Sequence, residues 1–281
     1  MEGESFVADA GIASQGAANN TPWSGHWWPT YNGDGNANLY DANGPLAKYD
    51  QYVKATTGQD SNAQAWEKQN HFTDNKQYDW AGHCHAWAAA SVLTRPVPAE
   101  GITKNGVHFT QDDLEGMIAS VYYNPTHQML PGGVRSETND PKAAEFKDMN
   151  PAWMHYLLQY YMGQHQSSFI MDTAAGAAVW NFPAFAYQMQ QKNNDDGSVN
   201  VTTRVWYSDA AIGAKSTRNF YKDYTYKLWN TGDGHMDGRW VGDSVKEHPD
   251  FAWVPTGKSE GGGKNPNVNE KVVEDILGYD I

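Results

Sequence analysis

The sequence predicts an α+β fold, with an N-terminal helical part that carries a cysteine and a C-terminal antiparallel sheet. Before Gly163, apolar residues recur at helical spacing, and several segments have helix-capping residues at their ends. After Gly163, apolar residues come in short runs separated by turn-forming clusters such as Asp-Asp-Gly-Ser at 195–198. Helices that precede strands, rather than alternate with them, are typical of the α+β class.

The composition narrows the classes of partner. The chain has 281 residues, including 12 tryptophans and 16 tyrosines, and a formal net charge of −13. Nucleic acids and anionic membranes bind basic surfaces, so this charge argues against both. No apolar run approaches the roughly 20 residues that a membrane span requires. We therefore expect a monomer with no nucleic-acid partner and no membrane partner.

Three regions are predicted along the chain. Residues 1–20 are small and polar, which predicts a disordered N-terminal segment. Residues 21–256 are predicted to form a single α+β domain. Residues 257–281 are predicted to be a glycine-rich linker and a short tail that includes a helix near 269–277. The chain begins Met-Glu-Gly-Glu-Ser-Phe, which lacks the basic and apolar regions of a secretory signal peptide.

An aromatic segment opens the predicted domain. Residues 21–31 hold three tryptophans, a tyrosine and two prolines. Packing into the core is the favoured interpretation, and one wall of a substrate cleft is the alternative.

The next segment has partial calcium-loop spacing. Asp34, Asn36 and Asn38 alternate as oxygen-bearing residues do at the start of such a loop. Leu39 and Pro45 stand where the loop would need glycine and glutamate, so we predict an ordinary turn-rich loop.

The predicted helices follow from caps and periodicity. Thr110 and Asp113 form a capping-box-like pair ahead of apolar residues at i, i+3, i+4 and i+7. Asn150 caps a helix that has proline at its first position and that ends at Gly163. The helices are expected over residues 46–56, closed by Gly58; 61–70, with Ser61 as N-cap and Trp66 facing inward; 84–95; 110–123; and 150–163.

The predicted strands lie in the second part of the chain. A strand over 168–171 ends at Asp172, and a further segment covers 178–183. Two hairpins and a closing strand follow at 184–190 with 199–207, 221–228 with 239–241, and 251–255.

Cys84 is the only cysteine, so no intramolecular disulfide can form. An alanine-rich run follows it as far as Pro96, which places Cys84 in the first turn of a helix after Gly82. Unpaired backbone N–H groups and the helix dipole favour a thiolate there, although a lone cysteine can also be a small buried hydrophobe. Residues 82–87, Gly-His-Cys-His-Ala-Trp, resemble the nucleophile segment of papain-like enzymes and of transglutaminases.

A thiol nucleophile needs a base, and the base needs an orienting group. His83 and His85 adjoin the cysteine but point to other faces of the helix, so neither is a good base. His155 lies in the buried helix 150–163, and Asp172 ends the strand that comes next. A satisfied core histidine and a turn-forming aspartate are the alternative interpretations of this pair.

The other candidates are weaker. Asn181 is an alternative orienting group, because papain-like enzymes often use asparagine. The remaining histidines are predicted in polar, turn or solvated positions, with His248 as a structural or cleft residue.

A more specific resemblance comes from residues 178–186, Ala-Val-Trp-Asn-Phe-Pro-Ala-Phe-Ala. They resemble the peptide segment that marks the transglutaminase elicitor family of oomycete cell-wall transglutaminases and marine-bacterial relatives. Further matching segments occur in the same order at 23–30, 82–88, 240–244 and 248–251. The resemblance implies a papain-like core, a thiol nucleophile and calcium-dependent crosslinking of protein glutamine to lysine. It also implies secretion, to an extracellular or periplasmic location.

On this resemblance we expect a transglutaminase with a Cys-His-Asp triad. Cys84 attacks a glutamine carboxamide, His155 protonates the departing ammonia, and Asp172 holds the imidazole. The expected oxyanion and substrate-binding residues are Gln77, Trp80, Trp87, Trp180 and Asn181.

Two other function classes remain. A papain-like cysteine hydrolase, either a peptidase or an amidase, would use the same residues with water as the acceptor. An aromatic-rich binding module would use no thiol chemistry. No residue is assigned as a metal ligand, and calcium enters only through the resemblance.

Overall fold

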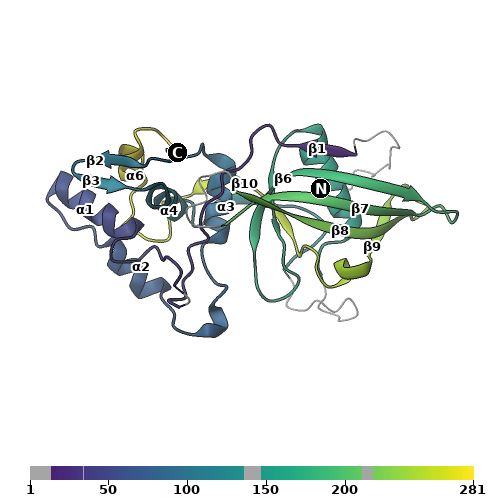
Figure 1. Ribbon diagram of the computed structural model, residues 1–281, viewed down its shortest axis with the longest axis horizontal. Coiled ribbons are helices and arrows are strands. Elements are labelled where there is room, and N and C mark those ends of the chain that lie inside the picture. The colour runs from purple at the N-terminus through teal and green to yellow at the C-terminus, as the bar shows by residue number, and fades with distance from the viewer. Residues whose placement is uncertain (1–13, 34, 136–146, 211–217) are drawn as a thin grey trace. The chain divides into compact units, whose positions relative to one another are not determined.

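The computed structural model describes residues 14–33, 35–135, 147–210 and 218–281, and Figure 1 shows its helices and strands. The chain divides into two compact units. The cysteine unit comprises Pro22–Gln128, Ser208–Arg218 and Pro255–Ile281. The sheet unit comprises Met1–Thr21, Met129–Tyr207 and Asn219–Val254. The last residues of the chain group with the cysteine unit, and the expected single domain over 21–256 stays a prediction.

Helices dominate the cysteine unit. They are α1 (Pro45–Thr57), α2 (Ala63–His71), the 3-10 helix η1 (Lys76–Tyr78), α3 (Cys84–Leu93), α4 (Gln111–Val121) and α6 (Glu270–Leu277). A short hairpin joins β2 (Ile102–Lys104) to β3 (Val107–Phe109). Helix α4 contacts α1, α3 and α6, and its residues Leu114, Met117 and Ile118 are completely buried. The core of this unit is therefore built around α4.

An antiparallel sheet dominates the sheet unit (Figure 1). Its strands follow the order β4-β10-β5-β6-β7-β8-β9, and β1 pairs with β6 outside this path. The strands are β1 (Gln15–Ala17), β4 (Pro125–Met129), β5 (Phe169–Asp172), β6 (Asn181–Asn193), β7 (Val199–Ser208), β8 (Asn219–Asn230), β9 (Met236–Trp240) and β10 (Ala252–Ser259). By the bounds given above, residues 125–128 of β4, 208 of β7 and 255–259 of β10 are counted with the cysteine unit. The helices are α5 (Pro151–Leu157), the π-helix η2 (Leu158–Gln164) and the 3-10 helix η3 (Gly242–Val245).

One apolar cluster joins α5 and η2 to the strands of this unit. Met154 and Leu158 are completely buried in it together with Phe169 of β5 and Val205 of β7. The mixed architecture, with helices and a large antiparallel sheet, confirms the predicted α+β class.

Several sequence signals set the observed ends of helices. Gly58 closes α1 with a φ of 75°, a left-handed conformation that glycine adopts without strain. Thr110 and Asp113 form both hydrogen bonds of a capping box at α4. Asn150 accepts a hydrogen bond from Ala152 N, at the start of α5. These three predictions are confirmed.

Two segments of the sheet unit differ from expectation. The α-helix expected to reach Gly163 ends at Leu157 and continues as η2. Residues 15–17, expected to be disordered, form β1, with Gly16 opposite Tyr187 of β6. A Cβ on Gly16 would lie 2.8 Å from Gly163 Cα and from Met162 C, so the approach of β1 to this backbone depends on glycine at position 16. Residues 1–13 lie outside the described part of the chain.

Helix α2 buries a different face from the expected one. Its N-cap is Asn62, because the Ser61 hydroxyl donates to Asp50 Oδ1 instead. Its buried residues are Ala63, Glu67 and His71, while Trp66 is half-buried. Residues i, i+4 and i+8 share a face of a helix, so two polar residues point into the unit.

The C-terminal residues form more structure than a linker and tail. Strand β10 extends to Ser259, and Asn269 caps α6 through Lys271 N. Val273 and Ile276 of α6 are buried, which explains why this segment groups with the cysteine unit. Within the described ranges, no helix combines the length and the apolar character needed to cross a lipid bilayer.

Candidate functional site

Cys84 is the first residue of α3, as the sequence predicts. The thiol belongs to a buried residue, 5% exposed, and it is not in a disulfide. The first backbone N–H groups of a helix have no partner within the helix and carry the positive end of its dipole. This position favours a thiolate and offers an N–H donor to a developing oxyanion.

The turn before α3 requires glycine. A Cβ on Gly82 would lie 2.7 Å from Trp27 Cε3 and 2.8 Å from Trp27 O. His83 N donates a hydrogen bond to the same Trp27 O at 2.7 Å. The backbone of the aromatic segment therefore holds the start of α3, and a side chain at position 82 would displace it.

The aromatic segment 21–31 serves mainly as core. Trp23 and Trp28 are 1% and 2% exposed, and Trp23 Nε1 donates to Thr94 Oγ1 at 3.1 Å. Trp27 is half-buried against Gly82. The packing interpretation thus fits all three tryptophans.

The predicted oxyanion and substrate-binding residues of the cysteine unit differ in exposure. Gln77 is exposed on η1, and Trp80 is half-buried in the turn that follows. Trp87 lies one turn after Cys84 on α3 and is completely buried. Their roles stay predictions.

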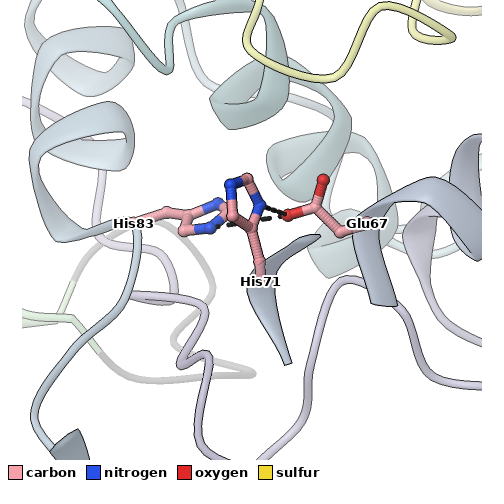
Figure 2. Close-up of side chains that lie close together, drawn as sticks. All are labelled: Glu67, His71 and His83. Atoms are coloured by element: carbon pink, nitrogen blue, oxygen red, sulfur yellow. Dashed lines mark hydrogen bonds and ion pairs between the residues drawn. The ribbon is translucent and has the colours of Figure 1, made fainter. Parts of the chain in front are cut away.

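Glu67, His71 and His83 form a buried polar cluster (Figure 2), and His83 precedes Cys84 in the sequence. His71 Nδ1 is 2.5 Å from Glu67 Oε1, and His83 Nε2 is 3.5 Å from the same oxygen. The three side chains are 3–7% exposed. The sequence predicts a polar setting for His71, and this prediction is wrong because His71 is buried. The signal that was missed is the i, i+4 spacing of Glu67 and His71 on α2.

Burial keeps both histidines beside Cys84 neutral. It lowers the pKa of His83 well below 6.5, and the charges of His71, His85 and Lys264 lower it further. Burial also lowers the pKa of His85, whose Nε2 lies 2.8 Å from Tyr123 O. That neither ring serves Cys84 as a base stays a prediction.

In the sheet unit, His155 is held inside the core. It is 5% exposed, and its Nδ1 lies 2.9 Å from Tyr226 Oη, which in turn lies 2.8 Å from Thr203 Oγ1. Burial lowers the pKa of His155 to about 4. This environment matches the alternative of a satisfied core histidine.

Asp172 ends β5 and is completely buried. Its Oδ1 accepts hydrogen bonds from Trp180 N at 2.7 Å and Ala174 N at 3.2 Å. Its Oδ2 is buried and has no hydrogen-bond partner among the described residues. Burial raises the pKa of this carboxyl to about 7, although the two backbone donors oppose the shift.

The structure does not bring His155 and Asp172 together by a hydrogen bond. In the described chain His155 bonds Tyr226, and the Asp172 carboxyl bonds backbone N–H groups only. Asp172 does lie opposite Asn181 in the β5–β6 pair. The expected orientation of the imidazole by Asp172 is therefore absent from this structure.

The alternative orienting group also has another partner. Asn181 Oδ1 accepts a hydrogen bond from Trp253 Nε1 at 2.8 Å. Trp180 is half-buried and stacks on Phe182, with ring centroids 6.4 Å apart.

His248 and Asp148 form a second buried pair, which the sequence does not predict. His248 Nε2 lies 3.0 Å from Asp148 Oδ2, its Nδ1 lies 2.9 Å from Ser244 O, and both side chains are completely buried. With both ring nitrogens occupied, His248 fits the structural interpretation. His26, predicted in a polar segment, is 4% exposed with Nε2 3.0 Å from Ala37 O.

Asn36 and Asn38, from the segment with partial calcium-loop spacing, do not form a calcium site. Asn38 is 1% exposed and donates to Pro29 O and Tyr31 O, while Asn36 is exposed. A calcium loop needs oxygen side chains that converge on one point. Asp34 lies outside the described residues.

The structure combines helices with a large antiparallel sheet, and its cysteine begins a helix. The structure is similar to the crystal structure of the GP42 transglutaminase from Phytophthora sojae, with a TM-score of 0.68 and 21% identity. The alignment covers 98% of this chain and 94% of that chain, and it shows the fold.

The chain belongs to the transglutaminase elicitor family, whose family model matches residues 59–212. This range includes Cys84, His155 and Asp172. A comparison with curated proteins finds no match. The resemblance found in the sequence is confirmed.

Proposed function

We propose that this protein is a protein-glutamine γ-glutamyltransferase, a transglutaminase that uses the Cys84 thiolate. The observation that carries the proposal is the position of the only cysteine at the first residue of α3 in a member of this family. Gly82 supports it, because the turn that positions Cys84 leaves no space for a Cβ.

The reaction has two acyl-transfer steps. The thiolate attacks the carboxamide carbon of a glutamine side chain, and a C–S bond forms. The C–N bond breaks, and the departing amide nitrogen takes up one proton and leaves as ammonia. A lysine or other primary amine then attacks the thioester carbon, a C–N bond forms, the C–S bond breaks, the amine nitrogen loses one proton, and the thiolate is restored. The Cys84 backbone N–H, with Gln77 or Trp80, is proposed to stabilise each oxyanion.

Asp172 is proposed to take part in the proton transfers. Its carboxyl has a pKa near 7 and one unpartnered oxygen, and such a group can hold or release a proton at neutral pH. His155, with its pKa near 4 and its bond to Tyr226, has more support as a structural residue than as the base. The two are tested separately below.

The family also supports the type of substrate and its location. Protein glutamine and lysine side chains are the proposed donor and acceptor, and the protein is proposed to act in an extracellular or periplasmic space. The expectation of a monomer is part of the same proposal.

The test is incorporation of a labelled primary amine into a glutamine-rich protein, with and without calcium. Wild type should incorporate the label, and Cys84→Ser should lower the rate by about 10⁴-fold or more. Thr94→Ser, on the residue after α3, is the matched control and should keep the activity.

Other results would assign another function. Hydrolysis of the donor without amine incorporation would favour the cysteine hydrolase. An equal rate in wild type and Cys84→Ser would refute acyl transfer through the thiol.

A further inference from the structure

The Glu67–His71–His83 cluster has no part in the proposed acyl transfer. One ligand atom from each of the three residues lies within 4.8 Å of the others. Figure 2 shows that the Glu67 carboxylate and the His83 ring approach His71 from different segments. Three potential metal ligands that converge in the interior of one unit call for a specific explanation.

We propose that Glu67, His71 and His83 form a binding site for Zn²⁺. The ligand atoms are Glu67 Oε1, His71 Nδ1 and His83 Nε2, which are the atoms that face one another. Two imidazoles and one carboxylate are a donor set that binds zinc with one further position open.

The donor set selects the metal. Imidazole nitrogens suit zinc and other late first-row ions, whereas calcium takes six to eight oxygen ligands. The cluster offers two nitrogens and one free carboxylate oxygen, so Ca²⁺ should not bind there.

Surrounding side chains hold the ligands in place. Asn265, which is 3% exposed, donates to Glu67 Oε2 at 3.0 Å and to Ala63 O at 2.9 Å. This bond occupies Oε2 and leaves Oε1 for the metal. Residues that bond ligating carboxylates in this way orient them and raise metal affinity.

Aromatic rings fix the two histidines. Tyr123 stacks on His71, with centroids 5.2 Å apart and planes at 7°, and meets His83 edge-on at 4.8 Å. Trp66 meets His71 edge-on at 5.6 Å. Rings held by packing lose little freedom when a metal binds, which favours binding.

The outer ring nitrogens of the two histidines limit the zinc affinity that we expect. The outer nitrogens, His71 Nε2 and His83 Nδ1, are buried and have no hydrogen-bond partner among the described residues. Metal-bound histidines usually donate from this nitrogen to an acceptor, and loss of that partner costs about 10- to 100-fold in affinity. We therefore expect binding weaker than in zinc sites with complete outer hydrogen bonding.

The test is titration of the chelator-treated full chain with Zn²⁺, and separately with Ca²⁺, by calorimetry. Wild type should bind one Zn²⁺ per chain and no Ca²⁺ at the cluster. His71→Ala and His83→Ala should each weaken zinc binding by at least about 100-fold, since even residues outside the ligand set cost 10- to 100-fold. The matched control is His108→Ala, on an exposed histidine of β3 in the same unit, and it should bind as wild type does.

A second measurement does not depend on variants that fold poorly. Co²⁺ in place of Zn²⁺ should give wild type the visible absorption of a four-coordinate site, and Cys84→Ser should keep it. Absence of zinc binding by wild type would overturn the proposal and leave a purely structural cluster. Unchanged binding in His71→Ala and His83→Ala, or loss of the cobalt band in Cys84→Ser, would also overturn it.

Discussion

Each unit buries a carboxyl group, and the two carboxyl groups differ in their hydrogen-bond partners. Glu67 in the cysteine unit faces three nitrogen atoms, from His71, His83 and Asn265. Asp172 in the sheet unit bonds two backbone N–H groups through one oxygen and has no partner for the other. A carboxyl with side-chain partners from several segments joins those segments, whereas one without them holds its proton more tightly.

This difference suits Asp172 to proton exchange and Glu67 to a structural role. Asp172, with its pKa near 7, is suited to exchange a proton. Glu67 is suited to hold the start of α3 in place, because its partner His83 is the N-cap of that helix. Four predictions test this division, in order of decreasing effect.

The largest effect is expected on catalysis, where the comparison predicts unequal roles in the sheet unit. Asp172→Asn should lower the rate of amine incorporation by about 10²- to 10⁴-fold, the range for removal of a proton-transfer group. His155→Gln should lower it less than about tenfold, because that ring is neutral and bound to Tyr226. Both rates are measured at pH 7 on protein with a wild-type circular dichroism spectrum. The reverse order would restore His155 as the base.

The next effect is on stability in the cysteine unit. Glu67→Ala should cost about 3 kcal/mol in the free energy of unfolding, because it leaves buried nitrogen donors on three residues without an acceptor. Urea unfolding in the presence of a chelator measures this cost. Glu100→Ala, on an exposed glutamate of the same unit, should change stability by less than about 0.5 kcal/mol. An equal loss of unfolding free energy in both variants would contradict a stabilising role for Glu67.

A smaller effect is expected from the turn before Cys84. Gly82→Ala should cost about 1–3 kcal/mol, since its methyl group would overlap the Trp27 ring and the Trp27 and Trp28 carbonyls. Removing the ring with Trp27→Ala should not restore the stability of Gly82→Ala, because the backbone contacts remain. Thermal unfolding of the single and double variants measures the difference. Full restoration would show that the ring alone requires the glycine.

The last effect is a pH dependence, which is the smallest when it is counted per pH unit. Folding raises the pKa of Asp172 from 3.8 to about 7, so between these values the folded chain binds more protons than the unfolded chain. The stability from this group is present below pH 4 and is lost as pH rises towards 7. Asparagine cannot titrate. The free energy of unfolding of Asp172→Asn should therefore rise relative to that of wild type by up to about 1.4 kcal/mol per pH unit from pH 4 to 7.

His155 acts in the opposite direction over part of this range. Folding lowers its pKa from 6.5 to about 4, so its contribution is present above pH 6.5 and is lost as pH falls. It is common to wild type and Asp172→Asn, and it cancels in their difference. Urea unfolding of both proteins at pH 5, 6 and 7 measures that difference, and a constant value would contradict a raised pKa for Asp172.

Local signals in the sequence were enough for much of the fold. Thr110 with Asp113, Asn150 with Pro151, and Gly58 each mark a helix end through bonds or dihedral angles within a few residues. The same holds for Cys84, because the alanine-rich run after it and the glycine before it are local features. The family could be inferred as well, because its segments occur in order along the chain.

Other features depend on residues far apart in the sequence. Strand β1 has almost no apolar signal, and Gly16 lets its backbone approach Met162 and Gly163, which lie far away in the sequence. The partner of His155 is Tyr226 rather than Asp172, and a side-chain hydrogen bond between distant strands and helices leaves no periodic trace.

The sequence by itself determined the α+β class, the family and the position of the thiol at a helix start, because each rests on local spacing or on an ordered set of motifs. Only the tertiary structure decided which buried polar groups have partners. Asn265 reaches Glu67 from the other end of the chain, and Asp172 keeps an oxygen without a partner inside the sheet unit. Burial and hydrogen bonding set the charge of such groups, and both depend on the whole packed unit rather than on neighbours in sequence.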